Sequence, residues 1–199
     1  EVKKNYAVPR KTEIKDEITE IKVDLKDMIP KEDVIVVVTN DGYIKKVPMK
    51  SFKAATDETT LKPGDFVRNM FELNTRDYIL SFTSLGNYLF IPVHTITECK
   101  WKDLGKHISN IIPLMDDEKI VHSMFVSDFD EEKYITSFSK NGMIKRTLLN
   151  EFKAQRYSKP IKMMNLKDDD EIVNVTDSSD REVFVATSCG YGLWYDVSE

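Results

Sequence analysis

Short apolar runs recur along the chain in one fixed pattern. Each run of apolar, β-branched or aromatic residues is followed by Ser or Thr, two further residues, a glycine and a second apolar run. The pattern occurs at residues 33–53, 77–97, 133–153 and 181–199. Strand formers on either side of a short turn predict a β-hairpin at each place. Each turn ends on a residue that takes a positive φ without steric strain. These residues are Gly42, Gly86, Gly142 and Gly190.

A second repeated element lies between the hairpins. Residues 112–121 match residues 164–173, and residues 60–67 are a looser copy. Each copy predicts a short strand, an acidic turn and another strand. With the hairpin this gives about four strands per repeat, which is typical of propeller blades. Only residues 24–28 and 148–152 favour a helical turn, so the predicted fold class is all-β.

The two ends of the chain differ from the repeats. Residues 1–20 are highly charged with few apolar positions, which predicts a connector, and residues 21–199 form the repeat domain. The chain stops soon after the fourth hairpin, where a closed propeller would leave a sheet edge exposed. We therefore expect a segment of something longer, with a set of about four blades that is incomplete at its C-terminal end.

Composition excludes several classes of protein. Hydrophobic residues make up 41% of the 199 positions, enough for a folded core, and no apolar run approaches the length of a spanning helix. The N-terminus has no signal-peptide pattern. Two cysteines cannot form a disulfide framework and fit a reducing cytosol. The formal net charge of −5 argues, at first sight, against a nucleic-acid partner.

The net charge is the sum of basic and acidic blocks that alternate along the chain. Residues 43–53 hold four lysines and no acid, and residues 143–162 hold six bases and one acid, whereas 116–132 and 167–182 are acidic. The two basic blocks occupy the same place in repeats one and three, so radial stacking would align them along one rim. Lys and Arg in such a stripe bind duplex backbone without reading sequence. The candidate DNA contacts are Lys45, Lys46, Lys50, Lys53, Lys145, Arg146, Lys153, Arg156, Lys159 and Lys162.

The bases have a simpler explanation as solvated strand faces. Repeats two and four weaken the DNA-binding hypothesis, because the former has His94, Thr95 and Thr97 where the others have bases, and the latter has no base after its glycine.

The sequence contains no recognisable catalytic or metal site. His94, His107 and His122 are scattered without metal-ligand spacing, and no phosphate-binding loop or nucleophile elbow occurs. The acidic run 168–171 does not fit a calcium loop, so a solvated turn is expected. The aromatic residues at repeat positions are expected to pack in the core. They are Phe52, Phe82, Phe90, Phe138, Phe152, Trp101 and Trp194.

The repeat resembles that of the C-terminal domain of bacterial type IIA topoisomerase A subunits. Residues 39–46 with Phe52, and residues 139–146 with Phe152, are the clearest copies. Residues 9–14 resemble the segment that leads from the breakage-reunion core into that domain. The gyrase branch carries a Gln-Arg-Arg-Gly-Gly-Lys-Gly box, which is absent from the corresponding residues 53–64. The resemblance therefore points to the branch formed by the A subunits of topoisomerase IV.

The resemblance carries expectations about fold and function. It implies a β-pinwheel, a propeller-like disc whose blades exchange strands, and a non-catalytic domain that binds and bends double-stranded DNA for decatenation and supercoil relaxation. The catalytic Tyr lies upstream, ATP and Mg²⁺ are used elsewhere, and no cofactor is expected here. The intact enzyme would be a bacterial cytoplasmic A2B2 heterotetramer, completed by two B subunits and associated with the nucleoid.

Two other functions stay open on sequence grounds. One is a protein-interaction propeller that docks a basic partner, such as a chromosome-organising protein, through its acidic face. The other is a domain of a gyrase A subunit that has lost its wrapping box.

Overall fold

The computed structural model describes residues 2–8, 28–167, 169–177 and 182–196. Of the predicted connector, residues 2–8 are described and contain the helix α1 (Val2–Tyr6). Residues 9–20 of that connector, and residues 24–27 of the first predicted helical turn, lie outside the described residues. No helix in the described ranges is long and apolar enough to cross a membrane.

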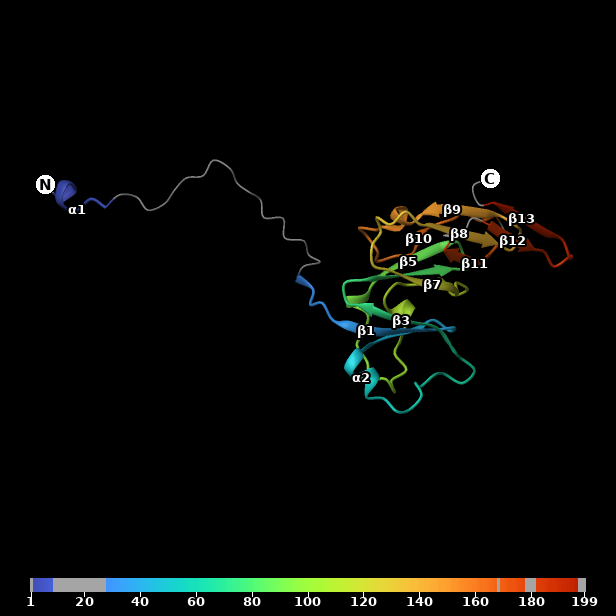
Figure 1. Cartoon of the computed structure of the whole chain (residues 1–199), viewed down its shortest axis with the longest axis horizontal. Helices are drawn as coiled ribbons and strands as arrows, with labels where there is room; N and C mark the ends of the chain where they lie inside the picture. The colour runs from blue at the N-terminus through green and yellow to red at the C-terminus, as the bar shows by residue number, and fades with distance from the viewer. Residues whose placement is uncertain (1, 9–27, 168, 178–181, 197–199) are drawn as a thin grey trace.

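Thirteen strands in the described chain form four antiparallel sheets, counted here from the N-terminus (Figure 1). The first sheet has the order β3–β1–β2–β6. Its strands are β1 (Asp33–Thr39), β2 (Tyr43–Pro48), β3 (Val67–Asn74) and β6 (Lys106–His107). The second has the order β10–β5–β4–β7. Its strands are β4 (Tyr78–Thr83), β5 (Asn87–Pro92), β7 (Ile120–Val126) and β10 (Ile161–Lys162).

The other two sheets have fewer strands in the described residues. The third has the order β11–β8–β9, with β8 (Tyr134–Ser139), β9 (Ile144–Leu148) and β11 (Ile172–Asp177). The fourth is the hairpin of β12 (Glu182–Ala186) and β13 (Gly192–Asp196). All four predicted hairpins are therefore present, and their turn glycines have φ between 76° and 84°.

In each of the first two sheets, one outermost strand comes from a part of the chain that follows the next hairpin. The strand β6 follows the second hairpin but pairs with β2 of the first, with Ile44 opposite Lys106. Likewise β10 follows the third hairpin but pairs with β5 of the second, with Tyr88 opposite Ile161. A four-stranded sheet is thus not one continuous segment. This is the strand exchange that the β-pinwheel resemblance implies, and the all-β prediction is confirmed.

Short helical turns follow the second strand of the first three hairpins. They are α2 (Met49–Lys53), η2 (Val93–Thr95) and η4 (Leu149–Phe152). A further turn, η3 (Ile108–Asn110), follows β6. The turn η4 confirms the helical tendency predicted for residues 148–152.

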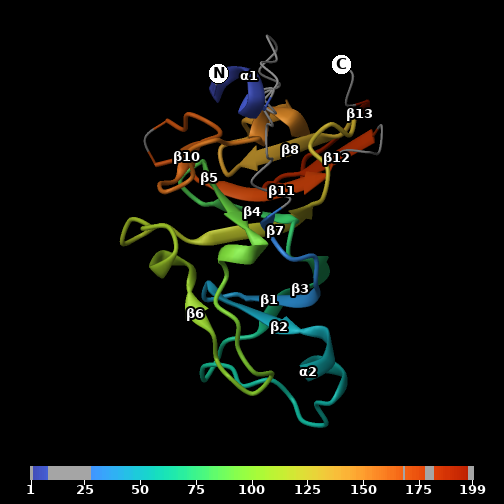
Figure 2. The same ribbon diagram turned by 90° about the vertical axis from the view of Figure 1, so that its left-hand side faces the viewer.

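Two buried clusters hold the sheets together. The first cluster joins the first two sheets and includes Val36, Ile44 and Ile91. The second joins the second and third sheets and includes Phe82 and Phe152, whose rings meet edge to face at 5.7 Å. Figure 2 shows the sheets one above another, with β1 and β2 below β4 and β7, and β8 and β12 above them. Apolar burial between successive sheets is therefore what stabilises the stack.

The aromatic predictions have mixed outcomes. Phe82, Phe90 and Phe152 are buried, as predicted. Phe52, Phe138 and Trp101 are half-buried. The prediction is wrong for Trp194, which is 69% exposed, because neither buried cluster extends to the fourth hairpin.

The acidic turns clamp the hairpins rather than simply facing water. Asp170 Oδ1 accepts hydrogen bonds from the backbone N–H of Asn141 at 3.0 Å and of Glu171 at 2.9 Å. Asp65 Oδ1 does the same for the backbone N–H of Asp41 at 3.0 Å. Both side chains tie an acidic turn to the tip of the hairpin before it. The expectation of a solvated turn at 168–171 is therefore wrong for Asp170, which is 9% exposed.

These hydrogen bonds lower the pKa of the Asp170 carboxyl. Burial alone would raise this pKa, but the bonds from Ser139, Asn141 and Glu171 outweigh it and hold the pKa below its ordinary value of 3.8. A carboxylate with a lower pKa in the folded chain stabilises the fold above pH 3.8, and this contribution is lost as the pH falls through the lowered pKa. The acidic turns thus have a structural role at neutral pH.

Candidate nucleic-acid interface

The six predicted bases of repeat three all lie on the surface. They are Lys145, Arg146, Lys153, Arg156, Lys159 and Lys162, and we call them the third-repeat basic surface. Two of them are on β9, an edge strand of the third sheet in the described residues, and Lys162 is on β10, the outermost strand of the second sheet. Strand exchange thus places bases from one sequence block on two neighbouring sheets.

Contacts within this surface fix several side chains without burying their charge. The Lys145 ammonium donates to the Met163 carbonyl at 2.6 Å, and the Lys162 ammonium donates to the Leu85 carbonyl at 3.0 Å. The Arg146 guanidinium lies 3.8 Å from the centre of the Tyr134 ring, a cation–π contact. Exposed cations that are already positioned lose less side-chain entropy when they meet an anion.

The four predicted bases of repeat one divide into two pairs. Lys50 and Lys53 are exposed on α2. Lys45 and Lys46 are only 2% and 8% exposed. The expectation that these two face the outside of a rim is therefore not met, although they occupy the same repeat positions as Lys145 and Arg146.

The Lys45 ammonium donates its hydrogen bonds to other groups of the protein. It donates to the carbonyls of Trp101 and Asp103 at 2.6 Å each and to the Thr59 hydroxyl, and it lies 5.2 Å from the centre of the Trp101 ring. Burial lowers the pKa of Lys45, while Cys99 and Asp103 act in the opposite direction. The Lys46 ammonium reaches the His94 carbonyl at 3.4 Å. Both lysines hold neighbouring chain segments in place.

Residues 97–107, which we call the covering segment, bury the Lys45 ammonium and pair with the backbone of Lys46, whose own ammonium points to His94 outside the segment. The segment starts by bonding both backbone groups of Lys46: its N–H donates to the Thr97 carbonyl at 3.2 Å, and its C=O accepts from the Cys99 N–H at 2.8 Å. It ends in β6, paired with β2. Gly105 has φ +87°, and a Cβ there would lie 2.7 Å from the Ile44 carbonyl oxygen. The segment therefore packs directly on β2.

Three exposed lysines of the covering segment were not among the predicted contacts. They are Lys100, Lys102 and Lys106. They lie in the part of the chain after the second hairpin, where an alignment of repeats assigns them to the second blade. Only the pairing of β6 with β2 shows that they belong to the first sheet, so the hairpin pattern gave no signal for them.

Acids are distributed unequally between the two basic regions. The surface of the first sheet includes the exposed acids Asp57, Glu58, Glu98 and Asp103. Lys102 is ion-paired with Asp57 at 2.5 Å, and both side chains are exposed. The 143–162 interval contains only one acid, Glu151. The sequence interval that supplies the third-repeat basic surface therefore has the larger excess of bases over acids.

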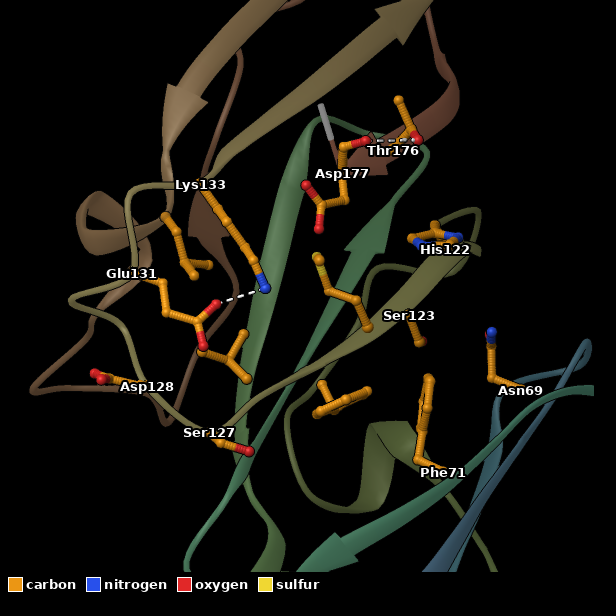
Figure 3. Close-up of a pocket in the computed structure, with 14 residues that line it drawn as sticks. Asn69, Phe71, His122, Ser123, Ser127, Asp128, Glu131, Lys133, Thr176 and Asp177 are labelled. Carbon is orange, nitrogen blue, oxygen red and sulfur yellow. Dashed lines mark hydrogen bonds and ion pairs between the residues drawn. The ribbon is translucent and has the colours of Figure 1, made fainter. Parts of the chain in front are cut away.

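A cavity of about 410 Å³ lies between β3, β7 and β11 (Figure 3). Its wall includes His122, whose pKa is lowered by burial and by the nearby Arg68 guanidinium. Ser123 also lines it, but its hydroxyl is hydrogen-bonded to that of Ser81 at 2.9 Å. Lys133 is paired with Glu131 at 2.5 Å. The residues described around this cavity do not form a nucleophile–base pair.

No group of three or more His, Cys, Asp or Glu residues in the described ranges is placed to hold a metal ion.

Comparison with models of known protein families shows to which family the chain belongs. The family model described as DNA gyrase C-terminal domain, beta-propeller, matches residues 33–56, 77–127, 133–177 and 181–199. The chain belongs to this family. The matched ranges contain all four hairpins, so membership of the DNA gyrase C-terminal domain family agrees with the repeat found in the sequence.

Within this family the chain is similar to topoisomerase IV. The A subunit of DNA topoisomerase 4 from Bacillus subtilis (strain 168) is 42% identical over 200 residues, which cover 100% of this chain and 25% of the relative. Its counterpart from Staphylococcus aureus is 38% identical over 201 residues, with the same coverage. The chain thus spans about a quarter of the length of these curated relatives. The predicted resemblance to the topoisomerase IV branch is confirmed.

Solved structures agree with this relationship. A crystal structure of the C-terminal domain of DNA topoisomerase IV is 45% identical, has a TM-score of 0.81, and is matched over 85% of this chain and 53% of that one. The E. coli ParC C-terminal domain has a TM-score of 0.68 at 16% identity, with 84% and 66% of the two chains covered, which supports the fold.

Proposed function

We propose that this chain is the DNA-binding and bending domain of a topoisomerase IV A subunit, and that it has no catalytic residues of its own. The observation that carries the proposal is the third-repeat basic surface. Six exposed bases on β9, on β10 and in the segment between them, with a single acid in the same interval, suit the phosphate backbone of duplex DNA. Family membership and the similarity to topoisomerase IV relatives support the same partner.

The mode of binding follows from the kind of side chain. Lysine and arginine contact phosphates regardless of base sequence, so binding is weakly sequence-specific and strongly salt-dependent. In a propeller the sheets are arranged radially, and a duplex that followed the rim of such a domain would bend around it. Bending would present a DNA segment to the rest of the enzyme for decatenation and supercoil relaxation.

The remaining expectations concern the intact enzyme. We infer that it is an A2B2 heterotetramer, completed by two B subunits, in the bacterial cytoplasm and associated with the nucleoid. Its breakage-reunion tyrosine would lie outside these residues, and ATP and Mg²⁺ would be bound elsewhere.

The acidic surface supports a second candidate function. Asp116, Asp117, Asp128, Asp130, Glu131 and Glu132 are exposed or nearly so within residues 116–132. They would suit a basic protein partner. This alternative predicts that the chain does not bind duplex DNA even at low salt.

The decisive test is a fluorescence titration of the 199-residue chain with short duplex DNA at about 50 to 200 mM salt. Reversing Lys145→Glu with Arg146→Glu is expected to lower affinity about tenfold at the low-salt end and to reduce the salt slope by about 2, because two phosphate contacts are lost. The matched control exchanges the two bases, Lys145→Arg with Arg146→Lys, and should keep the slope. Absence of binding by the unmodified chain at about 50 mM salt would favour the protein-docking function.

The structure changes which variants can be used for this test. Reversing Lys45 and Lys46 also removes two basic charges, but it places carboxylates at two buried positions and would disturb the fold. A loss of DNA binding in that variant would therefore not identify a phosphate contact.

A further inference from the structure

The covering segment contains lysines to which the sequence repeat assigns no role. Lys45 is buried beneath it and Lys46, whose backbone pairs with it, is buried as well, so neither is placed to contact DNA from the surface of the first sheet. The exposed lysines of the segment are Lys100, Lys102 and Lys106. At this edge of the first sheet, the covering segment thus supplies exposed lysines next to two buried ones.

The position of Lys106 has a counterpart in the second sheet. Lys106 is on β6, which is exchanged onto β2, and Lys162 is on β10, which is exchanged onto β5 in the same way. Each exchanged strand therefore carries one exposed lysine on the outer edge of its sheet. The strands β6 and β10 lie on the same side of the first and second sheets (Figure 2), so each of these two neighbouring sheets carries one such lysine.

Side-chain contacts join the covering segment to the neighbouring helix. Phe52 of α2 packs against Trp101 with ring centres 4.8 Å apart, and the Trp101 indole N–H donates to the Asp57 carbonyl at 2.7 Å. The exposed Lys50 and Lys53 of α2 thus lie beside the covering segment. We call Lys50, Lys53, Lys100, Lys102 and Lys106 the first-sheet patch.

We propose that the covering segment provides the duplex DNA contact of the first sheet, through Lys100 and Lys106, in place of the buried Lys45 and Lys46. The proposal rests on the DNA-binding function proposed above and extends its contact surface from two sheets to three. Lys45 has a positioning role, because its ammonium bonds the carbonyls of Trp101 and Asp103 from below. Lys102 contributes less, since its ion pair with Asp57 must be exchanged for a phosphate.

The nearby acids make this a weaker contact than the third-repeat basic surface. Glu98 and Asp103 lie in the covering segment itself, and Asp57 pairs with Lys102. A phosphate approaching Lys100 or Lys106 therefore meets a smaller net positive charge. The first-sheet patch should extend the path of a bound duplex rather than capture it.

The test reverses Lys100→Glu with Lys106→Glu in the 199-residue chain and titrates it with short duplex DNA across a salt range. The expected result is a roughly fivefold to tenfold loss of affinity at about 50 mM salt and a salt slope smaller by about 2, with the melting temperature unchanged. The matched control, Lys100→Arg with Lys106→Arg, retains both charges and should bind like the unmodified chain. A neutral variant, Lys100→Gln with Lys106→Gln, provides the same test if charge reversal alters the fold.

A parallel titration of the Lys145→Glu and Arg146→Glu double variant separates the two proposals. If that variant binds weakly while the Lys100 and Lys106 variants keep the affinity and slope of the unmodified chain, the covering segment does not contact DNA and the present inference is overturned alone. If neither set of variants weakens binding, both site assignments fail, and if the unmodified chain does not bind duplex DNA, the DNA-binding function itself fails. Equal losses in the Glu and Arg variants of Lys100 and Lys106 would also overturn the inference, because charge would not be responsible.

Discussion

Lys45 and Lys145 follow the turn glycine of their hairpins by the same number of residues, yet their surroundings are opposite. Lys45 is 2% exposed and bonds to two backbone carbonyls beneath the covering segment. Lys145 is exposed on β9 and bonds to one carbonyl. The neighbouring isoleucines show the same contrast, because Ile44 is 1% exposed and Ile144 is 38% exposed. The second strand of the first hairpin is covered by residues that follow the second hairpin, whereas in the described residues, which end at 196, nothing pairs with the outer side of β9.

The difference shows that a repeat position does not determine the role of its side chain. The outer neighbour of each of the first two hairpins comes from a later part of the chain, through pairing between residues far apart in sequence. A lysine covered in this way must satisfy its ammonium with protein groups, since an unpaired buried charge is strongly unfavourable. An uncovered lysine keeps its charge available for a polyanion.

The largest expected effect is the difference in the free energy of unfolding between a charge reversal at Lys45 and one at Lys145. Lys45→Glu would place a carboxylate against the carbonyls of Trp101 and Asp103 and should lower the free energy of unfolding by about 4 kcal/mol. Lys145→Glu, at the exposed position, should change it by less than about 1 kcal/mol. Chemical denaturation followed by circular dichroism measures both values. Similar losses in the two variants would mean that the environments of these lysines do not differ as described.

A smaller difference in stability is expected between alanine substitutions at two of the turn glycines. Gly86 has φ +76°, and a Cβ there would lie 2.4 Å from the Met164 carbonyl oxygen. Gly142 has φ +84°, but a Cβ there would meet nothing within 4 Å. Gly86→Ala should therefore cost about 3 kcal/mol, from the left-handed backbone together with the steric clash, whereas Gly142→Ala should cost only about 1 kcal/mol for the backbone.

Thermal unfolding of these two alanine variants provides the measurement. Gly142→Ala is the matched control, because it has the same backbone conformation without the overlying residues 163–164. If both variants lost the same stability, the close contact between Gly86 and the segment after β10 would not contribute to the stability of the fold.

Much of the fold could be predicted because its signals are local. Runs of strand formers and a glycine in each turn predicted the four hairpins, and their residues pair as expected. The exchanged strands could not be predicted in this way, since β6 and β10 contain two residues each, too few for a strand pattern to be recognised. They form because backbone groups of β2 and β5 need partners. Tertiary pairing, rather than local preference, therefore determines the sheet edges.

The candidate site was predictable to the extent that its residues remain exposed. Eight of the ten predicted bases are on the surface, and the two that are not, Lys45 and Lys46, lie on β2 where the covering segment pairs with it. Asp170 illustrates the same limit. Its acidic run indicated a turn, but the bonds that it accepts from Asn141 and Glu171 depend on the hairpin tip lying against it.

The central claim is that Lys45 supports the fold while its repeat equivalent Lys145 faces DNA. The most direct test is the salt dependence of duplex binding for Lys45→Met and Lys145→Met, measured at a temperature at which both variants are folded. We expect the salt slope of Lys145→Met to be smaller than that of the unmodified chain by about 1, and the slope of Lys45→Met to be unchanged. A reduced slope in Lys45→Met, with the slope of Lys145→Met unchanged, would contradict the account.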